Sequence, residues 1–137
     1  MANAGKSIGD TRLRFELIIN TIEDGVILMD DQQTIQLINP GAAAITGWKL
    51  DEATNINVQQ VMHLVDDKGQ PISDNDNPLV QIFKTNQTIR SNKAILANRE
   101  GKQVPISLSL TPLMDDGQHV AAAVAVFRNE SEEDRKS

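Results

Sequence analysis

The stretch that most constrains the fold runs from Lys102 to Phe127. Its first half alternates between apolar and polar side chains, and the apolar positions are Val104, Ile106, Leu108 and Leu110. A period of two predicts a strand with one buried face and one wetter face. An Asp-Asp-Gly sequence at 115–117 then supplies a turn, and the apolar run from Val120 to Phe127 predicts a strand covered on both faces. We therefore expect a long antiparallel hairpin that the rest of the chain covers.

Composition limits the classes of protein that this chain can belong to. Its 137 residues, 39% hydrophobic and 23% charged, predict one globular domain with short extensions. The sequence has no Cys, which excludes disulfides, Cys-ligated metals and thiol nucleophiles. A formal net charge of −6 argues against nucleic acid as a partner. No apolar run reaches the roughly 20 residues that span a bilayer, and no signal peptide is visible, so we expect a cytoplasmic segment.

An amphipathic helix is predicted near the N-terminus, ending at about Glu23. Its large apolar residues recur at i, i+3, i+4 and i+7, and they are Phe15, Ile18, Ile19 and Ile22. The helix either packs only on its own domain or also contacts a second subunit. Because the apolar stripe is wider than one side of a small sheet usually needs, we favour a role in a homodimer.

Two Asn-Pro pairs predict helix starts in the middle of the chain. In each pair Asn is suited to cap the helix and Pro to occupy its first position, at 39–40 and at 77–78. The first of these helices is short, covering residues 41–46, and a polar link of residues 49–57 follows it. Apolar residues between Val58 and Leu64 also have helical spacing.

Three further β-rich runs complete the pattern. Residues 26–29 and 34–39 flank the turn sequence Asp-Asp-Gln-Gln, and residues 88–98 precede the long hairpin. The order of elements is a helix, two strands, several short helices and three strands. This order predicts an α+β domain with one five-stranded antiparallel sheet.

Three local stretches, in this order, resemble the PAS domain, a sensor module of signalling proteins. They are DGVILMDDQQTIQLINPGAAAITGW (24–48), NREGKQVPISLSLTPLMDDG (98–117) and VAVFRNESEEDRK (124–136). The resemblance covers about residues 13–136. It implies a PAS-like sheet with short helices on one face. It also implies a leader with an amphipathic helix (1–24), the PAS domain (25–128) and the start of a C-terminal signalling linker (129–137).

The C-terminal end departs from the common PAS pattern of Asp, an aliphatic residue and Thr. The corresponding residues are Asn129, Glu130 and Ser131, which keep hydrogen-bonding ability at the outer positions but lose the Asp charge. The resemblance implies that Arg128, Asn129 and Ser131 pass a signal to an output domain in the same chain. It further implies a histidine kinase of a two-component system, a GGDEF or EAL cyclic-dinucleotide protein or another PAS domain, because residues 61–83 are similar to PAS domains of such bacterial proteins.

Several cofactors are excluded or disfavoured by the residues present. Flavin-binding light sensors of this family use a Cys near Val58, and a Cys also attaches the yellow-protein chromophore, so both kinds of covalent photochemistry are excluded. His63 is the only candidate haem ligand near the pocket, and a lone His beside Met62 is more often partly exposed. The acidic loop of residues 66–76 is interpreted as a solvated connection rather than a metal site. No catalytic constellation has supporting spacing, so we do not expect an enzyme.

The resemblance implies an apolar cavity between the sheet and the helices. The residues expected to line it are Ile27, Met29, Ala42, Ile45, Val58, Met62, Leu79, Ile82, Leu96, Ile106, Leu108, Ala123 and Ala125. The alternative is that these residues form only a packed core. On the last strand the resemblance places the face of Ala121, Ala123 and Ala125 inward, and Val124 and Val126 toward the N-terminal helix or a partner subunit.

Two classes of function remain open at this stage. The first is a sensor domain in which a small apolar or weakly polar ligand controls an output domain. The second is a ligand-free dimerisation or protein-interaction module with a filled core. The small Ala side chains on the last strand favour the first class, because they leave volume for a ligand.

Overall fold

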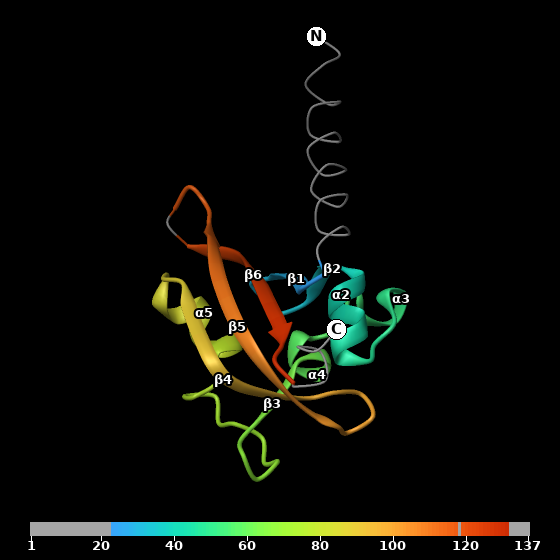
Figure 1. Ribbon diagram of the computed structural model, residues 1–137. Coiled ribbons are helices and arrows are strands. Elements are labelled where there is room, and N and C mark those ends of the chain that lie inside the picture. The colour runs from blue at the N-terminus through green and yellow to red at the C-terminus, as the bar shows by residue number, and fades with distance from the viewer. Residues whose placement is uncertain (1–22, 118, 132–137) are drawn as a thin grey trace.

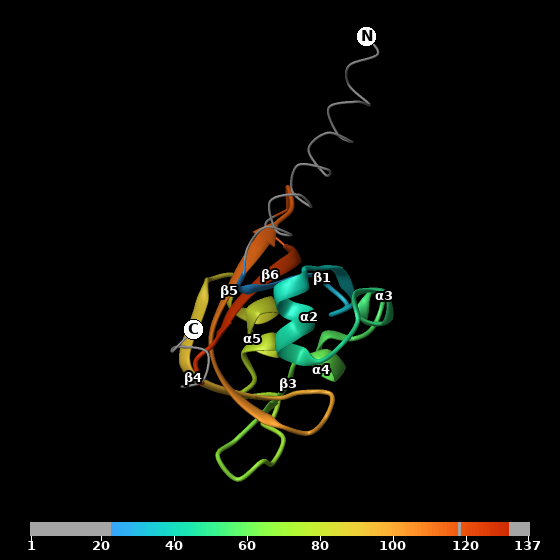
Figure 2. The same ribbon diagram turned by 45° about the vertical axis from the view of Figure 1, so that its right-hand side comes forward.

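A computed structural model describes residues 23–117 and 119–131 of the chain. The strands are β1 (Gly25–Asp30), β2 (Ile35–Ile38), β3 (His63–Val65), β4 (Ile89–Ala97), β5 (Gln103–Met114) and β6 (Val120–Asn129). The helices are α2 (Pro40–Thr46), α3 (Leu50–Ala53), α4 (Val58–Val61) and α5 (Pro78–Thr85). The strands form one antiparallel sheet in the order β2-β1-β6-β5-β4-β3, with the helices on one side (Figures 1 and 2). The predicted α+β architecture is confirmed.

The sheet has six strands in the described part of the chain, not the five that we expected. The additional strand is β3, which pairs with β4 through Leu64 and Leu96. Helical spacing had suggested one helix from Val58 to Leu64, but α4 ends after Val61, and Met62 leaves the helical conformation with φ −101° and ψ 76°. A short run of buried apolar residues satisfies either periodicity, which explains the error. The link of residues 49–57 likewise contains a helix, α3.

Four turns share one hydrogen-bonding pattern. In each, an Asp or Asn side chain accepts from the backbone N–H groups two and four residues later, at 2.9 to 3.0 Å; these residues are Asp30, Asp66, Asn98 and Asp115. The fourth residue of a turn adopts a left-handed conformation where the structure describes it, at Gln33, Gly69 and Gly101. This combination closes three-residue loops between antiparallel segments. The short loops fix the register of the sheet.

Asn39 joins β1, β2 and α2 at one buried point. Its Oδ1 accepts from the backbone N–H groups of Ala42 and Val26, both at 2.8 Å, and its Nδ2 donates to the carbonyl of Asp24 at 2.9 Å. The first contact is the predicted helix cap, and Asn77 caps α5 in the same way. Asn39 therefore links the start of the sheet to the helical side of the core.

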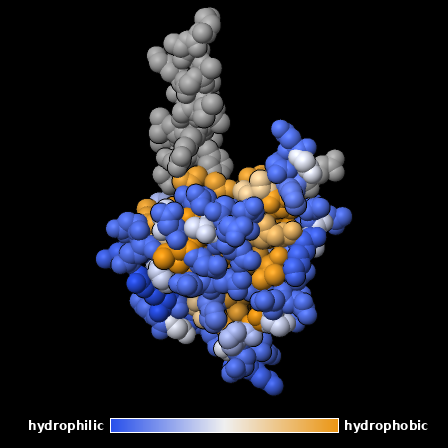
Figure 3. Space-filling view, turned by 180° about the vertical axis from the view of Figure 1, so that it is seen from behind, coloured by the Kyte–Doolittle hydropathy of each residue, from blue (hydrophilic) through white to orange (hydrophobic). Residues whose placement is uncertain are grey.

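The core lies between the sheet and the helices. Side chains from both sides, including Phe127 of β6 and Met62 after α4, are almost completely buried. Close packing extends to Gly25, where an added Cβ would lie 2.6 Å from the Phe127 ring. Viewed from behind, the surface is mainly hydrophilic, with smaller hydrophobic areas (Figure 3). Burial of apolar side chains between the two layers is thus the main stabilising interaction of the fold.

Candidate functional site

The structure brings the predicted pocket residues together. All of them are buried except Ile45, which is half-buried and packs against the same cluster. Ala123 and Ala125 have no exposed surface and lie on the core side of β6, as expected. Ala121 is exposed instead, because the pairing of β5 with β6 shifts register between Leu113 and Met114. In this structure the predicted pocket residues belong to one apolar core that is shielded from solvent.

His63 does not face this core. It is exposed and pairs with Ala97 in β3, while the adjacent Leu64 points inward and is buried. Alternation along the strand therefore directs the imidazole to the other side of the sheet. Among residues 23–117 and 119–131, no group of three or more His, Asp or Glu side chains is arranged to hold a metal ion.

An arginine connects the β4–β5 loop to the helical side. The Arg99 guanidinium lies 4.3 Å from the centre of the Trp48 ring and forms an ion pair with Glu52. The Arg99 backbone N–H also donates to the Thr46 carbonyl at 2.8 Å. The hydrogen bond from Arg99 holds the pKa of Glu52 below its ordinary value. These contacts close the edge of the core between α2 and the loop.

The opposite face of the sheet is partly apolar and is left partly open by the described residues. Val124 is half-buried and Val126 is 37% exposed, whereas the facing Val26 of β1 is buried. The sequence predicts that the strand from Val120 to Phe127, here β6, is covered by other residues on both faces. The N-terminal residues that were predicted to provide it, Phe15, Ile18, Ile19 and Ile22, lie outside the described residues.

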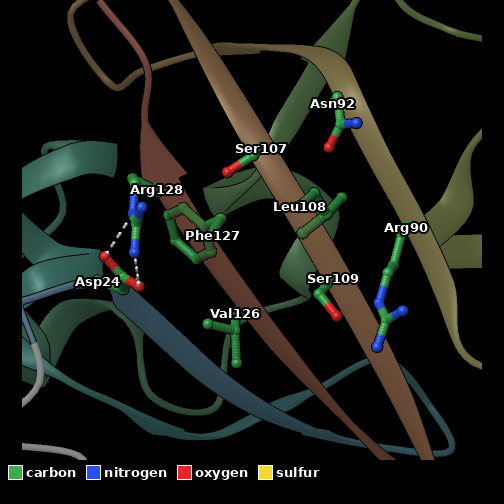
Figure 4. Close-up of a pocket in the computed structure, with 9 residues that line it drawn as sticks. All are labelled: Asp24, Arg90, Asn92, Ser107, Leu108, Ser109, Val126, Phe127 and Arg128. Carbon is green, nitrogen blue, oxygen red and sulfur yellow. Dashed lines mark hydrogen bonds and ion pairs between the residues drawn. The ribbon is translucent and has the colours of Figure 1, made fainter.

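A shallow groove of about 200 Å³ lies on this outer face of the sheet. It crosses β4, β5 and β6 and begins beside β1, and its lining residues are Asp24, Arg90, Asn92, Ser107, Leu108, Ser109, Val126, Phe127 and Arg128. Figure 4 shows Arg90 and Arg128 on either side of the two serines. Two guanidinium groups and two hydroxyl groups are thus arranged along the open side of the sheet. This polar groove borders the exposed part of Val126.

An ion pair joins the two ends of the described domain at this groove. The Arg128 Nε and an Nη atom donate to the two carboxylate oxygens of Asp24, at 3.2 and 3.3 Å (Figure 4). Hydrogen bonding to Asp24 raises the pKa of Arg128 further above its ordinary value. The pair brings the residue before β1 into contact with the end of β6.

The segment after β6 keeps part of the hydrogen bonding that the sequence suggested. Asn129 Oδ1 accepts from the backbone N–H of Ser131 at 2.9 Å, as a carboxylate at this position would. The Glu130 N–H donates to the Pro105 carbonyl at 2.8 Å and so continues the pairing with β5. The predicted output residues therefore lie at the end of β6, next to β5.

Most of the groove was not predicted from the sequence. Arg128, Val126 and Leu108 had been assigned other roles, and Arg90, Asn92 and Asp24 had been assigned none. The alternation of β5 had identified the outward positions of Ser107 and Ser109. The groove could not be predicted without the order of the strands, because that order places Arg90 of β4 beside β5 and near β6.

The comparisons with known proteins agree with this geometry. The sequence profile of the PAS domain family matches residues 23–132. The chain therefore belongs to the PAS domain family, whose members are sensory domains of signalling proteins. In the described part of the chain, no helix is long and apolar enough to cross a membrane.

Individual relatives are distant in sequence. The chain is 23% identical over 114 residues to the probable diguanylate cyclase DgcE of Escherichia coli strain K12. The matched region covers 82% of this chain but only 10% of DgcE. A PAS domain of a protein from Colwellia psychrerythraea has a TM-score of 0.68 at 15% identity, covering 89% of this chain and 96% of that one. A domain of the sensory box sensor histidine kinase/response regulator of Geobacter sulfurreducens has a TM-score of 0.61 at 17% identity, covering 87% and 94%.

Proposed function

We propose that this chain is the regulatory PAS domain of a longer bacterial signal-transduction protein. In this proposal residues 25–128 form the sensor, residues 1–24 precede it and residues 129–137 begin the linker to a cytoplasmic output domain. The output is a histidine kinase or a GGDEF or EAL cyclic-dinucleotide enzyme. A similar sequence in a probable diguanylate cyclase and a similar fold in a sensor histidine kinase/response regulator support these choices. The chain covers about a tenth of the curated relative, which supports a multidomain parent.

The arrangement of β6 is the observation that carries this proposal. The inner face of the strand places Ala123 and Ala125 in the apolar core, and its outer face exposes Val126. The strand then ends at Arg128 and Asn129, which begin the proposed output segment. One strand thus connects the proposed ligand site, the proposed dimer surface and the exit from the domain.

A small apolar ligand in the core would act by shifting a two-state equilibrium of the domain. It can do so only to the extent that it binds the two states with different affinity. The core side chains are almost completely shielded from solvent, so a ligand enters this site only if the helices and the sheet separate locally. Ala123 and Ala125 are positions on the sheet side of the core where little side-chain volume opposes this movement.

The proposed homodimer uses the outer face of the sheet. Val124 and Val126 supply apolar surface, and the predicted N-terminal stripe of Phe15, Ile18, Ile19 and Ile22 adds to it. A ligand-free dimerisation module is the second candidate, and the almost complete burial of the core side chains favours it. The two candidates differ in whether the core ever contains a ligand.

Native mass spectrometry of freshly purified protein, before and after denaturation, separates the candidates. Excess mass that disappears on denaturation supports a ligand sensor and begins to identify the ligand. The Ala125→Leu variant should then lose the excess mass while keeping its assembly state, because the larger side chain fills the core. A folded protein without excess mass, including after incubation with cell extract, favours the ligand-free module.

The dimer is tested by placing a charge on the outer face. Val126→Glu should convert a dimer into a monomer in analytical ultracentrifugation, because burial of an unpaired charge is unfavourable. Ala44→Glu is the matched control, because Ala44 is exposed on α2 on the helical side. An unchanged dimer in the Val126→Glu variant would exclude this face as the interface.

A further inference from the structure

The groove on the outer face contains polar side chains whose hydrogen-bonding groups are not used within the described domain. Arg90, Asn92, Ser107 and Ser109 line it, and none of these side chains makes a hydrogen bond or ion pair to a described residue. Arg128 has Asp24 as its partner, but its side chain is still 65% exposed. Within the described part of the chain, the groove thus presents the Arg90 guanidinium without an ion-pair partner and the Arg128 guanidinium with Asp24 as its partner.

Strand register brings these groups together. Arg90 lies opposite Ser109 on β5, and Ser109 lies opposite Val126 on β6. Ser107 lies opposite Arg128 in the adjacent row. Neighbouring strands are about 4.8 Å apart, so the backbones of β4 and β6 are separated by about 10 Å across β5. Arg90 and Arg128 thus lie on opposite sides of β5, with Ser107 and Ser109 between them (Figure 4).

We propose that this groove binds a small anion that carries carboxylate or phosphate groups. Guanidinium groups bind both kinds of oxyanion with paired, charge-assisted hydrogen bonds, and the hydroxyl groups supply further donors. The volume of about 200 Å³ equals that of roughly seven water molecules in the liquid, since each occupies about 30 Å³. It is smaller than the 300–1,000 Å³ that is usual for drug-sized ligands. Inorganic phosphate or a small organic acid fits this size.

Binding at the groove also acts on the ion pair at the ends of the domain. An anion that engages Arg128 competes with the Asp24 carboxylate for the same guanidinium. Asp24 is half-buried, and its backbone carbonyl is held by Asn39, so this residue cannot move freely with the arginine. The anion therefore weakens the contact between the start of β1 and the end of β6. This site does not depend on the proposed core ligand. It shares the outer face, including Val126, with the proposed dimer surface, so an anion and a partner subunit compete for this face.

The test is an NMR titration of the full chain with citrate and, separately, with inorganic phosphate. Ionic strength is kept constant with potassium chloride, so that general screening does not change during the titration. Chemical-shift changes are expected at residues of β4, β5 and β6 that line the groove. The anion with the lower Kd identifies whether carboxylate or phosphate chemistry is preferred.

Three variants complete the test, each checked for folding by its melting temperature. Arg90→Gln should weaken anion binding about tenfold, the effect of losing one charge-assisted interaction. Lys68→Gln makes the same change of charge in the loop after β3 and should bind as the original chain does. Asp24→Asn should strengthen binding several-fold, because the competing carboxylate is removed. Equal weakening in Arg90→Gln and Lys68→Gln, or no saturable binding of either anion, overturns the proposal.

Discussion

Asp24 and Arg128 are 104 positions apart in the sequence, yet both carboxylate oxygens of Asp24 accept hydrogen bonds from the Arg128 guanidinium. The next residues along each strand, Gly25 and Phe127, are paired in the sheet. The start of β1 and the end of β6 therefore lie side by side, at the same end of two central strands. A change in the relative position of β1 and β6 would therefore move the residue before β1 relative to the end of β6.

This ion pair should contribute little to stability. Its two side chains are 65% and 29% exposed, and exposed ion pairs are screened by water and salt. We expect the Asp24→Asn variant to melt within about 3 °C of the original chain. Asp31→Asn, in the adjacent exposed turn, is the control for the change in net charge. A much larger loss specific to Asp24→Asn would mean that its carboxylate has a structural role.

The contact between Gly25 and Phe127 should be far less tolerant of substitution. A Cβ at position 25 would lie 2.6 Å from the Phe127 ring, and that ring is only 1% exposed, so it has no free space to enter. Gly25→Ala should lower the free energy of unfolding by about 1–3 kcal/mol, the usual cost of overpacking. Urea denaturation measures this change.

A double-mutant cycle provides the control for that prediction. Phe127→Leu removes the ring, so adding Gly25→Ala to it should cost much less than Gly25→Ala alone. Additive losses of stability would show that the ring is not the cause.

Asn39 should be the most sensitive polar residue of the core. Replacement by Ala removes three side-chain hydrogen bonds to described residues and leaves the Val26 N–H and the Asp24 carbonyl without this partner. We expect the free energy of unfolding to fall by about 2–4 kcal/mol, because buried polar groups lose their partners. The comparison site is Asn57, an exposed residue that caps the N-terminus of α4. Its Oδ1 accepts one hydrogen bond, from the Gln59 N–H at 2.8 Å. Asn57→Ala should cost about 1 kcal/mol, and equal losses at both positions would contradict this account.

The sequence was most informative where local chemistry determines local structure. The Asn-Pro pairs fixed the starts of α2 and α5, because the cap and the proline act within one turn of helix. Alternation along residues 103–110 identified the inward and outward faces of β5 correctly. Strand β3 was missed because it has only three residues, and its two buried apolar residues, Leu64 and Val65, are equally compatible with a helix.

The groove could not be predicted for a different reason. Arg90 and Arg128 are brought to one face only by the pairing of β4 with β5 and of β5 with β6. Their register depends on an irregularity between Ser91 and Ala94, which no local pattern in the sequence indicates. Sequence patterns predict which face a side chain occupies, but the neighbours across a sheet follow from tertiary structure.

The ion pair between Arg99 and Glu52 predicts a pH dependence of stability. The folded-state pKa of Glu52 lies below its unfolded value of about 4.3, mainly because of the hydrogen bond from Arg99. The stabilisation is therefore complete above that unfolded value and is lost as the pH falls through the folded value. The difference in urea midpoint between the original chain and Glu52→Gln should be constant from pH 6 to pH 8 and should shrink below about pH 4.

Glu100→Gln is the control for this pH dependence. Glu100 is exposed in the same loop, and its carboxylate makes no ion pair with a described residue. This variant should follow the original chain over the whole pH range. A Glu52→Gln difference that grows as the pH falls would have the wrong sign for the proposed ion pair.

Substitutions at Gly101 and Gln33 should change stability in opposite directions. The two residues occupy equivalent left-handed positions in their turns, with φ of 86° and 65°. Gly101 has open space around it, so Gly101→Ala should cost about 1 kcal/mol through backbone strain alone. Gln33 already carries this strain, but its side chain accepts a 2.7 Å hydrogen bond from Gln59. In a Gln59→Ala background, Gln33→Gly should therefore stabilise the domain by up to about 1 kcal/mol in urea denaturation. A destabilising effect there would mean that Gln33 has another stabilising contact that outweighs its conformational strain.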